Sequence, residues 1–396
     1  MRNYQLLRHL SRRHAISLLT YRSRGESDRQ QDQGQLGWSV HTVDDERPLG
    51  ALKRRAQLAS LLSPRSFQGR SMSSPAMQGA ISRLLAERDF DVVQVEQSQL
   101  GGVDFGSRVV SLLDEHNLEY EVLSRAFRTE TSPVRRLYNL VEFVKLRHEE
   151  RRAWKRFDGC VVTSQRAQAV INKYLPTKPT VVVPNGVDLE HFQPTDRPRD
   201  PTSIVFTGSI DYRPNTDAVT YFVREIFPQI IQAHPDATFT VVGMRPPEQV
   251  KSLAGRNVIV TGQVPDVRPY LARASVVIAP LRMGSGTRLK LLEAMAMGAA
   301  VVSTTLGCEG LAVRGGEHLL VADQPHLFAR DVVRLLNDPG LASELGRQGR
   351  ALVEREYGWA SAAQRLDEFL IDMVASKRAV LQPTVRSTEP RPQRFA

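Results

Sequence analysis

The sequence predicts an α/β protein made of two Rossmann-like domains. Three observations lead to this prediction. The 396 residues exceed the ~100–200 typical of one domain. Short apolar segments of strand length alternate with longer amphipathic segments, which is typical of mainly parallel sheets. Near the middle, Pro184-Asn185-Gly186 ends an apolar segment with a sharp turn, and the alternation then begins again.

The alternation places each element in order. In the first half we expect helices at 49–62, 75–87 and 119–157, the last broken near Pro133, and strands at 15–21, 38–43, 92–96, 108–113, 160–163 and 181–183. In the second half we expect strands at 203–206, 238–242, 258–260, 275–278, 300–303 and 318–321. The helices expected there lie at 216–233, 267–274, 287–297, 325–336, 341–357 and 359–374.

These patterns divide the chain into four parts. Residues 1–184 form a first domain and residues 185–357 a second. The helix at 358–375 is expected to pack back towards the first domain. Residues 376–396 are rich in Pro, Arg, Ser and Thr, a composition typical of a disordered tail.

The beginning of the first domain departs from the usual pattern. The chain opens with the amphipathic segment 2–14 and continues directly into the strand at 15–21. A Rossmann-like domain begins with a strand and a Gly-rich turn before its first helix, so the first strand is missing from the sequence as given. Either the start was assigned too late or the sheet lacks a central strand, and we favour the first alternative.

Positive charge is concentrated in the first half. Residues 1–185 carry 29 basic and 20 acidic side chains, a net of +9 out of +10 for the whole chain. This indicates an anionic partner, either a phosphate-bearing substrate or a membrane surface. Nucleic acid is disfavoured, because zinc-finger spacing and interleaved aromatic and basic residues are both lacking. We expect a cytoplasmic protein, either free or peripheral at the inner face of the plasma membrane.

The stretch 280–302, PLRMGSGTRLKLLEAMAMGAAVV, carries the most chemistry. An apolar strand leads into Gly284-Ser285-Gly286, and a helix is expected from Thr287. A Gly-rich turn at a helix N-terminus offers free N–H groups to an anion. Arg288 and Lys290 add positive charge, and Glu293 lies where a carboxylate can accept hydrogen bonds from a ribose diol. The alternative is an ordinary strand–turn–helix with surface Arg and Lys.

Here the sequence resembles the group 1 (family 4) glycosyltransferases, which have the GT-B fold. The resemblance implies two Rossmann-like domains that face each other across a cleft. The likeness continues in VVPNGVDLEHF at 182–192, FTGS at 206–209 followed by Pro214-Asn215, VTGQVPD at 260–266, STTLGCEGL at 303–311 and LDEHN at 113–117. Several motifs in order across two domains are more specific than any one. The resemblance implies a nucleotide-sugar donor held mostly by the second domain and an acceptor held mostly by the first.

The resemblance also implies the residues of the donor site. Glu293 would bind the donor ribose, and the catalytic group would comprise His116, Arg288, Lys290 and Glu293. The expected donor-binding residues are Gly208, Ser209, Arg213, Val264, Gly284, Ser285, Gly286, Thr287, Arg288, Lys290 and Glu293.

Two departures from the family pattern affect that site. Ser285 stands where the family commonly has a first Glu, so the sequence leaves the sugar undetermined. Ser209 and Pro214 stand where a basic pair often grips the diphosphate. We infer that Arg288 and Lys290, together with Arg213, supply the compensating charge.

His116 is the candidate on the acceptor side. It follows the apolar strand at 109–113, where doubly wound sheets place ligand groups. By resemblance it contacts the donor or the acceptor near the reacting carbon, with Asp114 and Asn117 beside it. The alternative is a histidine hydrogen-bonded in a turn with Asn117.

Neither a metal nor a cofactor is expected. Asp89-Phe90-Asp91 fits an Asp-x-Asp metal motif, but it precedes its strand rather than following it, which favours a solvated strand entrance. A basic helix at 135–156 is either a solvated face over a core stripe or a membrane-surface helix that brings the enzyme to a lipid-linked acceptor.

The expected function is a retaining, metal-independent transfer of a sugar from a nucleotide-diphosphate sugar to a glycan or lipid-linked acceptor, in polysaccharide or glycolipid biosynthesis. The alternatives are a sugar-nucleotide epimerase of the same fold and a catalytically impaired protein that binds a sugar nucleotide.

Overall fold

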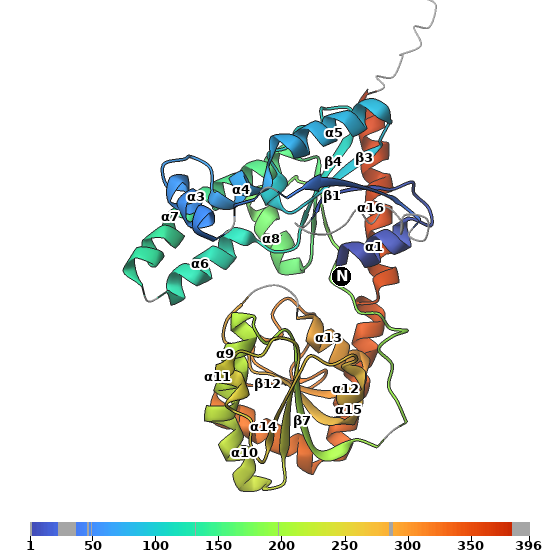
Figure 1. The fold of residues 1–396 in the computed structure, drawn as a ribbon. Helices are drawn as coiled ribbons and strands as arrows, with labels where there is room; N and C mark the ends of the chain where they lie inside the picture. The colour runs from blue at the N-terminus through green and yellow to red at the C-terminus, as the bar shows by residue number, and fades with distance from the viewer. Residues whose placement is uncertain are drawn as a thin grey trace, which may run out of the picture.

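The computed structural model describes residues 2–22, 37–45, 47–48, 50–130, 132–196, 198–284 and 288–381 (Figure 1). Two α/β domains follow one another along the chain, and the last helix returns to the first of them. Residues 382–396 of the tail expected at 376–396, and the turn residues Ser285, Gly286 and Thr287, lie outside the described residues.

The strands of the first domain are all parallel and form two separate sheets. β1 (Ser17–Arg22) pairs with β2 (Ser39–Asp44). The second sheet has the order β3-β4-β5-β6 (Val92–Glu96, Val110–Glu115, Gly159–Val162, Thr180–Val182). Among the described residues no strand joins β1 to β3. The strands of the two-stranded sheet are only partly buried, whereas every residue of β4 is buried.

Helices cover both faces of the four-stranded sheet. On one face Cys160 and Val162 pack with Trp154 and Ile171, and on the other face Val161 packs with a different set of helices, as the two-residue period of a strand requires. The helices of this domain are α1 (Arg2–Leu10), α3 (Gly50–Ser60), α4 (Phe67–Met72), α5 (Pro75–Glu87), α6 (Glu119–Thr129), α7 (Pro133–Arg156), α8 (Gln165–Tyr174) and the short 3₁₀ segment η2 (Ser98–Leu100).

The second domain is a six-stranded parallel sheet with the order β12-β11-β10-β7-β8-β9. The strands are Leu320–Val321, Ala300–Ser303, Ala274–Ala279, Asp200–Thr207, Thr238–Val242 and Val258–Gly262, in that order. Two apolar clusters pack against its opposite faces. Its helices are α9 (Arg213–Tyr221), the π segment η3 (Phe222–Ile226), α10 (Phe227–Ala233), α11 (Glu248–Lys251), α12 (Arg268–Arg273), α13 (Leu289–Ala296), α14 (Pro325–Asn337) and α15 (Pro339–Glu356).

Several predicted bounds need correction. The long helix expected at 119–157 is indeed divided at Pro133, into α6 and α7. The strand expected at 318–321 is reduced to Leu320–Val321, and α4 and α8 were not predicted. The helix expected from Thr287 begins at Leu289, because Arg288 has the extended backbone of an N-cap residue (φ −86°, ψ 90°).

α16 (Trp359–Leu381) joins the two ends of the chain. It packs along α1 on one face of the four-stranded sheet, where Leu366 lies in a cluster with Leu6, Leu10 and Trp359 (Figure 1). The last six residues of the helix, 376–381, belong to the predicted tail. Lys377 Nζ holds this last part in place by donating to Val109 O (2.6 Å) and Asp158 Oδ2 (2.8 Å).

The packing of α16 on α1 predicts the effect of a core substitution. Leu366→Ala removes a fully buried side chain and leaves a cavity, so we expect a loss of about 2–5 kcal/mol in the free energy of unfolding of the first domain. Ile371→Ala, on an exposed position of the same helix, is the matched control and should change it by less than about 0.5 kcal/mol. Urea unfolding measures both, and equal effects would show that α16 is not docked at Leu366.

Candidate functional site

The carboxyl ends of the two large sheets point towards each other. The loop after β5 and the loop after β11 meet between the domains, where Arg166 Nε lies 3.8 Å from Glu309 Oε1. In the same place a Cβ on Gly310 would lie 3.7 Å from the Cβ of Ser164. In Figure 1, α13 lies in the part of the second domain nearest the first. Polar residues that follow the strands of either domain are therefore directed towards one shared region.

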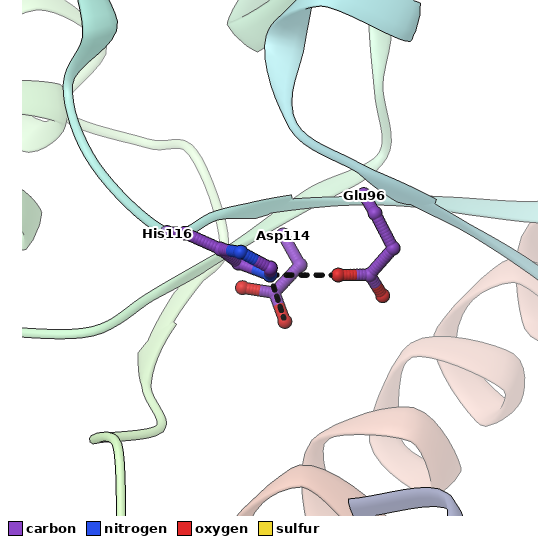
Figure 2. Close-up of side chains that lie close together, drawn as sticks. All are labelled: Glu96, Asp114 and His116. Carbon is purple, nitrogen blue, oxygen red and sulfur yellow. Dashed lines mark hydrogen bonds and ion pairs between the residues drawn. The ribbon is translucent and has the colours of Figure 1, made fainter. Parts of the chain in front are cut away.

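Glu96, Asp114 and His116 form a cluster at the carboxyl ends of β3 and β4 (Figure 2). The parallel register of the two strands pairs Glu96 with Asp114. His116 Nε2 lies 2.8 Å from Glu96 Oε2 and 3.9 Å from Asp114 Oδ2. Thr163 Oγ1, at the end of β5, donates to His116 O over 3.1 Å and fixes the backbone there. The histidine bonds to a neighbouring strand rather than to Asn117.

Asp114 lies beneath the histidine and is bound by the N-terminal helix. Its side chain is fully buried, and Arg2 Nη2 donates to both of its oxygens (3.2 and 3.1 Å). The same guanidinium donates through Nη1 to Val183 O (2.9 Å) and Pro184 O (3.2 Å), where the chain leaves the first domain. Burial raises the pKa of Asp114 to about 6 although Arg2 acts in the opposite direction. Because it is enclosed, Asp114 can position His116 but cannot touch an acceptor.

The pKa of His116 is raised. Burial lowers it, but the hydrogen bond to Glu96 and the charges of Asp114 and Glu96 outweigh that effect. The raised pKa increases the protonated fraction of the imidazole at any given pH, and the imidazolium can donate a hydrogen bond or offset negative charge on a bound group. Asn117, the third residue expected on the acceptor side, is half-buried and bonds through its side chain to Glu119.

The cluster is a hydrogen-bonded network rather than an open set of metal ligands. One ligand atom from each of Glu96, Asp114 and His116 lies within 4.8 Å of the others, a spacing that a cation could use. Both oxygens of Asp114, however, accept from Arg2, and His116 Nε2 is bonded to Glu96. A divalent cation would have to displace the guanidinium. The Asp-x-Asp motif lies at the opposite end of β3, where Asp91 is exposed and paired with Arg378 over 2.7 Å.

Lys290 is the centre of the candidate donor site in the second domain. Its Nζ donates to Asn215 Oδ1 (2.8 Å) and lies 3.8 Å from the centroid of the Phe206 ring. Asn215 Nδ2 donates in turn to Ser209 O (2.8 Å), so α9 and α13 are joined through the loop that follows β7. Gly208 is favoured in that loop, because residues with side chains rarely adopt its φ of 150° and a Cβ there would lie 2.9 Å from both Lys290 Nζ and Asn215 Nδ2.

The other charged residues of α13 lie around this lysine. Arg288 is buried at the N-cap, and a Cβ on Gly284 (φ 109°) would lie 3.0 Å from its Nη2. Glu293 is half-buried three residues after Lys290, on the same face of the helix. Burial, then the charge of Arg288, lowers the pKa of Lys290 to about 7, and burial raises that of Glu293. Such a lysine gains most from an anionic ligand, which would restore its charge.

The structure also places the expected donor residues Arg213 and Val264. Arg213 is exposed at the first residue of α9, and Val264 is half-buried in the loop after β9, packed against the core. Sequence reasoning also missed three residues that the structure brings to the site, namely Arg2, Glu96 and Asn215. Glu96 ends a predicted strand next to the one that leads to His116, so its position at a strand end was the available signal.

Comparison with known proteins identifies the family. The family model described as Glycosyltransferase Family 4 matches residues 2–191, and that described as Glycosyl transferases group 1 matches residues 201–338. The chain belongs to the group 1, family 4 glycosyltransferases. The two matches together span both domains, and the predicted family and GT-B fold are confirmed.

Relatives of this glycosyltransferase agree with that assignment. It is 27% identical to the phosphatidyl-myo-inositol mannosyltransferase of Mycobacterium tuberculosis over 307 residues, which cover 74% of this chain and 76% of that protein. Its fold matches sucrose-phosphate synthase from Thermosynechococcus elongatus with a TM-score of 0.64 at 18% identity, covering 91% of this chain and 99% of that one. Anabaena HepE, solved with UDP and glucose, matches with a TM-score of 0.60 at 14% identity, covering 93% and 94%.

The Glu96–His116 contact predicts a change in the titration of the histidine. Glu96→Gln removes the carboxylate that favours the imidazolium, so the pKa of His116 should fall. NMR of the imidazole resonances as a function of pH measures this directly, with Glu87→Gln, an exposed position on α5, as control. If His116 titrates at the same pH in the Glu96→Gln protein, Glu96 does not control its charge.

Proposed function

We propose that this protein is a retaining, metal-independent glycosyltransferase that moves a sugar from a nucleotide-diphosphate sugar to a glycan or lipid-linked acceptor. The observation that carries the proposal is the half-buried Lys290 with Glu293 on the same face of α13. The helix that carries both, α13, lies in the part of the second domain nearest the first domain (Figure 1). A cation whose pKa is lowered by burial is suited to a diphosphate, and a neighbouring carboxylate is suited to a ribose diol.

The names of the relatives support this kind of donor. HepE was solved in complex with UDP and glucose and in complex with UDP-glucose. Other relatives are named as mannosyltransferases, including the Mycobacterium tuberculosis protein. A nucleotide-activated hexose is therefore the class of donor that we propose, with the base and the sugar left to experiment.

The residues of the second domain would act on the leaving group. Cleavage of the bond between the anomeric carbon and the phosphate oxygen leaves negative charge on the diphosphate and positive charge on the sugar. Lys290 and Arg288 would stabilise that anion together with the amides that begin α13. Because these groups are already held in place, little reorganisation is needed as the charge develops.

The residues of the first domain would act on the acceptor side. The acceptor oxygen forms a bond to the anomeric carbon on the face that the leaving group departs from, and its proton passes to the departing phosphate oxygen. The configuration is then retained. His116, oriented by Glu96, would position the reacting groups and share charge with them.

The place of action remains part of the proposal. No helix among the described residues has the length and apolar content needed to cross a bilayer. We propose that the protein acts in the cytoplasm, at the inner face of the plasma membrane, in the synthesis of a polysaccharide or a glycolipid.

The charge of Lys290 predicts that donor binding takes up a proton. With a pKa of about 7 the free amine is mostly neutral at pH 8, whereas the diphosphate favours its protonated form. Calorimetry in two buffers of different ionisation enthalpy should show proton uptake at pH 8. Lys290→Met should abolish the uptake and weaken donor affinity about tenfold to a hundredfold. Lys251→Met, on exposed α11, is the control, and unchanged affinity in Lys290→Met would refute the donor site.

The reaction type is tested on purified product. We expect NMR to show the same anomeric configuration in product and donor, and turnover that is unchanged by EDTA. Inversion, or activity lost with EDTA and restored by Mg²⁺ or Mn²⁺, would contradict the proposed mechanism. A new sugar nucleotide formed without acceptor would indicate an epimerase, and donor binding without any product would indicate a catalytically impaired protein.

A further inference from the structure

One end of the first domain exposes a large number of apolar side chains. They belong to α3 and the residues just after it, and to the first half of α7, which we call together the α3–α7 surface. Leu62 is 94% exposed and Val134 is 79% exposed, values that are unusual for large aliphatic residues. The exposed apolar residues of this surface are Leu52, Leu58, Leu61, Leu62, Val134, Leu137, Leu140 and Val144.

The α3–α7 surface is one continuous unit rather than two separate patches. Lys145 Nζ, on α7, donates to Ser60 O at the end of α3 over 2.7 Å. Ser60 Oγ donates to Glu142 Oε1 over 3.1 Å. Figure 1 shows both helices at the same end of the first domain. Any body that covers α3 therefore also meets the exposed side of α7.

The charge on this surface has one sign. Between Glu46 and Glu87 the sequence contains seven basic and no acidic residues. Three of these, Lys53, Arg54 and Arg55, are exposed on α3, and no other described residue forms an ion pair with them. The exposed beginning of α7 adds Arg135 and Arg136, again without an acidic residue between Glu130 and Glu142.

α3 needs a surface to pack on. Of its 11 residues only Ser60 is buried, so the rest of the described chain leaves most of the helix surface uncovered. A helix of this length is marginal in water unless an apolar face is covered. Its exposed leucines and its basic residues are the combination that favours adsorption to an anionic lipid surface.

We propose that the α3–α7 surface docks the protein on an anionic lipid bilayer. The leucines would enter the boundary between headgroups and acyl chains, and the Lys and Arg residues would contact anionic headgroups. A second copy of this chain is a poorer occupant, because a two-fold contact places the same patch against itself and therefore sets basic residues against basic residues. The proposal rests on the proposed function in one respect, since it implies a lipid-linked acceptor.

The surface lies at a fixed distance from the candidate site. α6 begins next to His116, and its 11 residues span about 16 Å before the chain reaches the exposed start of α7. Glu150, on α7, accepts from Glu119 N (2.8 Å) and Tyr120 N (2.9 Å) at the beginning of α6. A bilayer bound at the α3–α7 surface would therefore stand at a set position relative to His116, as an acceptor anchored in that bilayer requires.

Vesicle flotation of the full chain tests the electrostatic part. We expect binding to phosphatidylcholine vesicles that contain phosphatidylglycerol, weaker binding without the anionic lipid, and weaker binding at high salt. Lys53→Gln/Arg54→Gln/Arg55→Gln should weaken binding to the anionic vesicles about a hundredfold. Lys251→Gln/Arg256→Gln/Arg334→Gln removes three exposed charges from the second domain and should leave binding unchanged.

A second variant tests the contribution of the exposed leucines to vesicle binding. Leu58→Ser/Leu61→Ser/Leu62→Ser should abolish flotation, whereas Ile259→Ser/Ile371→Ser/Val380→Ser, at exposed positions elsewhere, should not. Urea unfolding of each protein shows whether it is folded. Absence of flotation by the native protein, or equal loss in the target and control variants, would overturn the proposal. So would light scattering that shows the native protein to be a dimer and the triple leucine variant a monomer, with no vesicle binding by either.

Donor calorimetry on the same proteins separates this proposal from the proposed function. The variants of the α3–α7 surface should bind donor with the affinity of the native protein, because none of their residues lies in the candidate donor site. A native protein that floats with vesicles but neither binds nor uses a sugar nucleotide would contradict the proposed function and leave the docking surface standing.

Discussion

The common direction of the strands is the constraint on which the site depends. Every described strand pair in the three sheets is parallel. All carboxyl ends of one sheet therefore meet at one edge, and residues far apart in sequence are gathered there. This brings Glu96 beside His116 in the first domain, and it brings the loop after β7 beside the beginning of α13 in the second. The helix α16, which packs on the first domain after the second is complete, helps to hold the two edges facing each other.

Both halves of the site contain charges that are partly or wholly removed from water. In the first domain the free-energy cost of burying the Asp114 carboxylate is offset, because Arg2 binds both of its oxygens and also two backbone carbonyls. In the second domain the cost of burying the charge of Lys290 is offset less completely, because its Nζ contacts a neutral amide and an aromatic ring. The pKa of Lys290 is accordingly lowered to about 7. The second arrangement leaves the lysine with more to gain from an incoming anion. This difference agrees with the proposed roles, a fixed histidine on one side and a phosphate-binding lysine on the other.

Much of the fold could be predicted from the sequence, because alternating apolar periods reveal strands and helices without knowledge of their packing. Spacing alone also predicts that His116 follows a buried strand, and that Lys290 and Glu293 lie on one helix. Arg2 could not be predicted, since its partner Asp114 lies 112 residues away and only the packing of α1 brings them together. The helix α13 begins at Leu289, two residues later than predicted, because the backbone of Arg288 is extended, which the sequence pattern does not reveal. The helix beyond Ser376 was missed because its stabilising partners, Val109 and Asp158, are remote in sequence.

The central claim is that a nucleotide diphosphate binds between the two domains at the beginning of α13. A crystal structure of the protein with its sugar-nucleotide donor tests this most directly. The account predicts diphosphate oxygens within about 3 Å of Lys290 Nζ, the ribose hydroxyls on Glu293, and the anomeric carbon turned towards His116. A nucleotide bound elsewhere, or one whose ribose and phosphates leave Glu293 and Lys290 untouched, would contradict it.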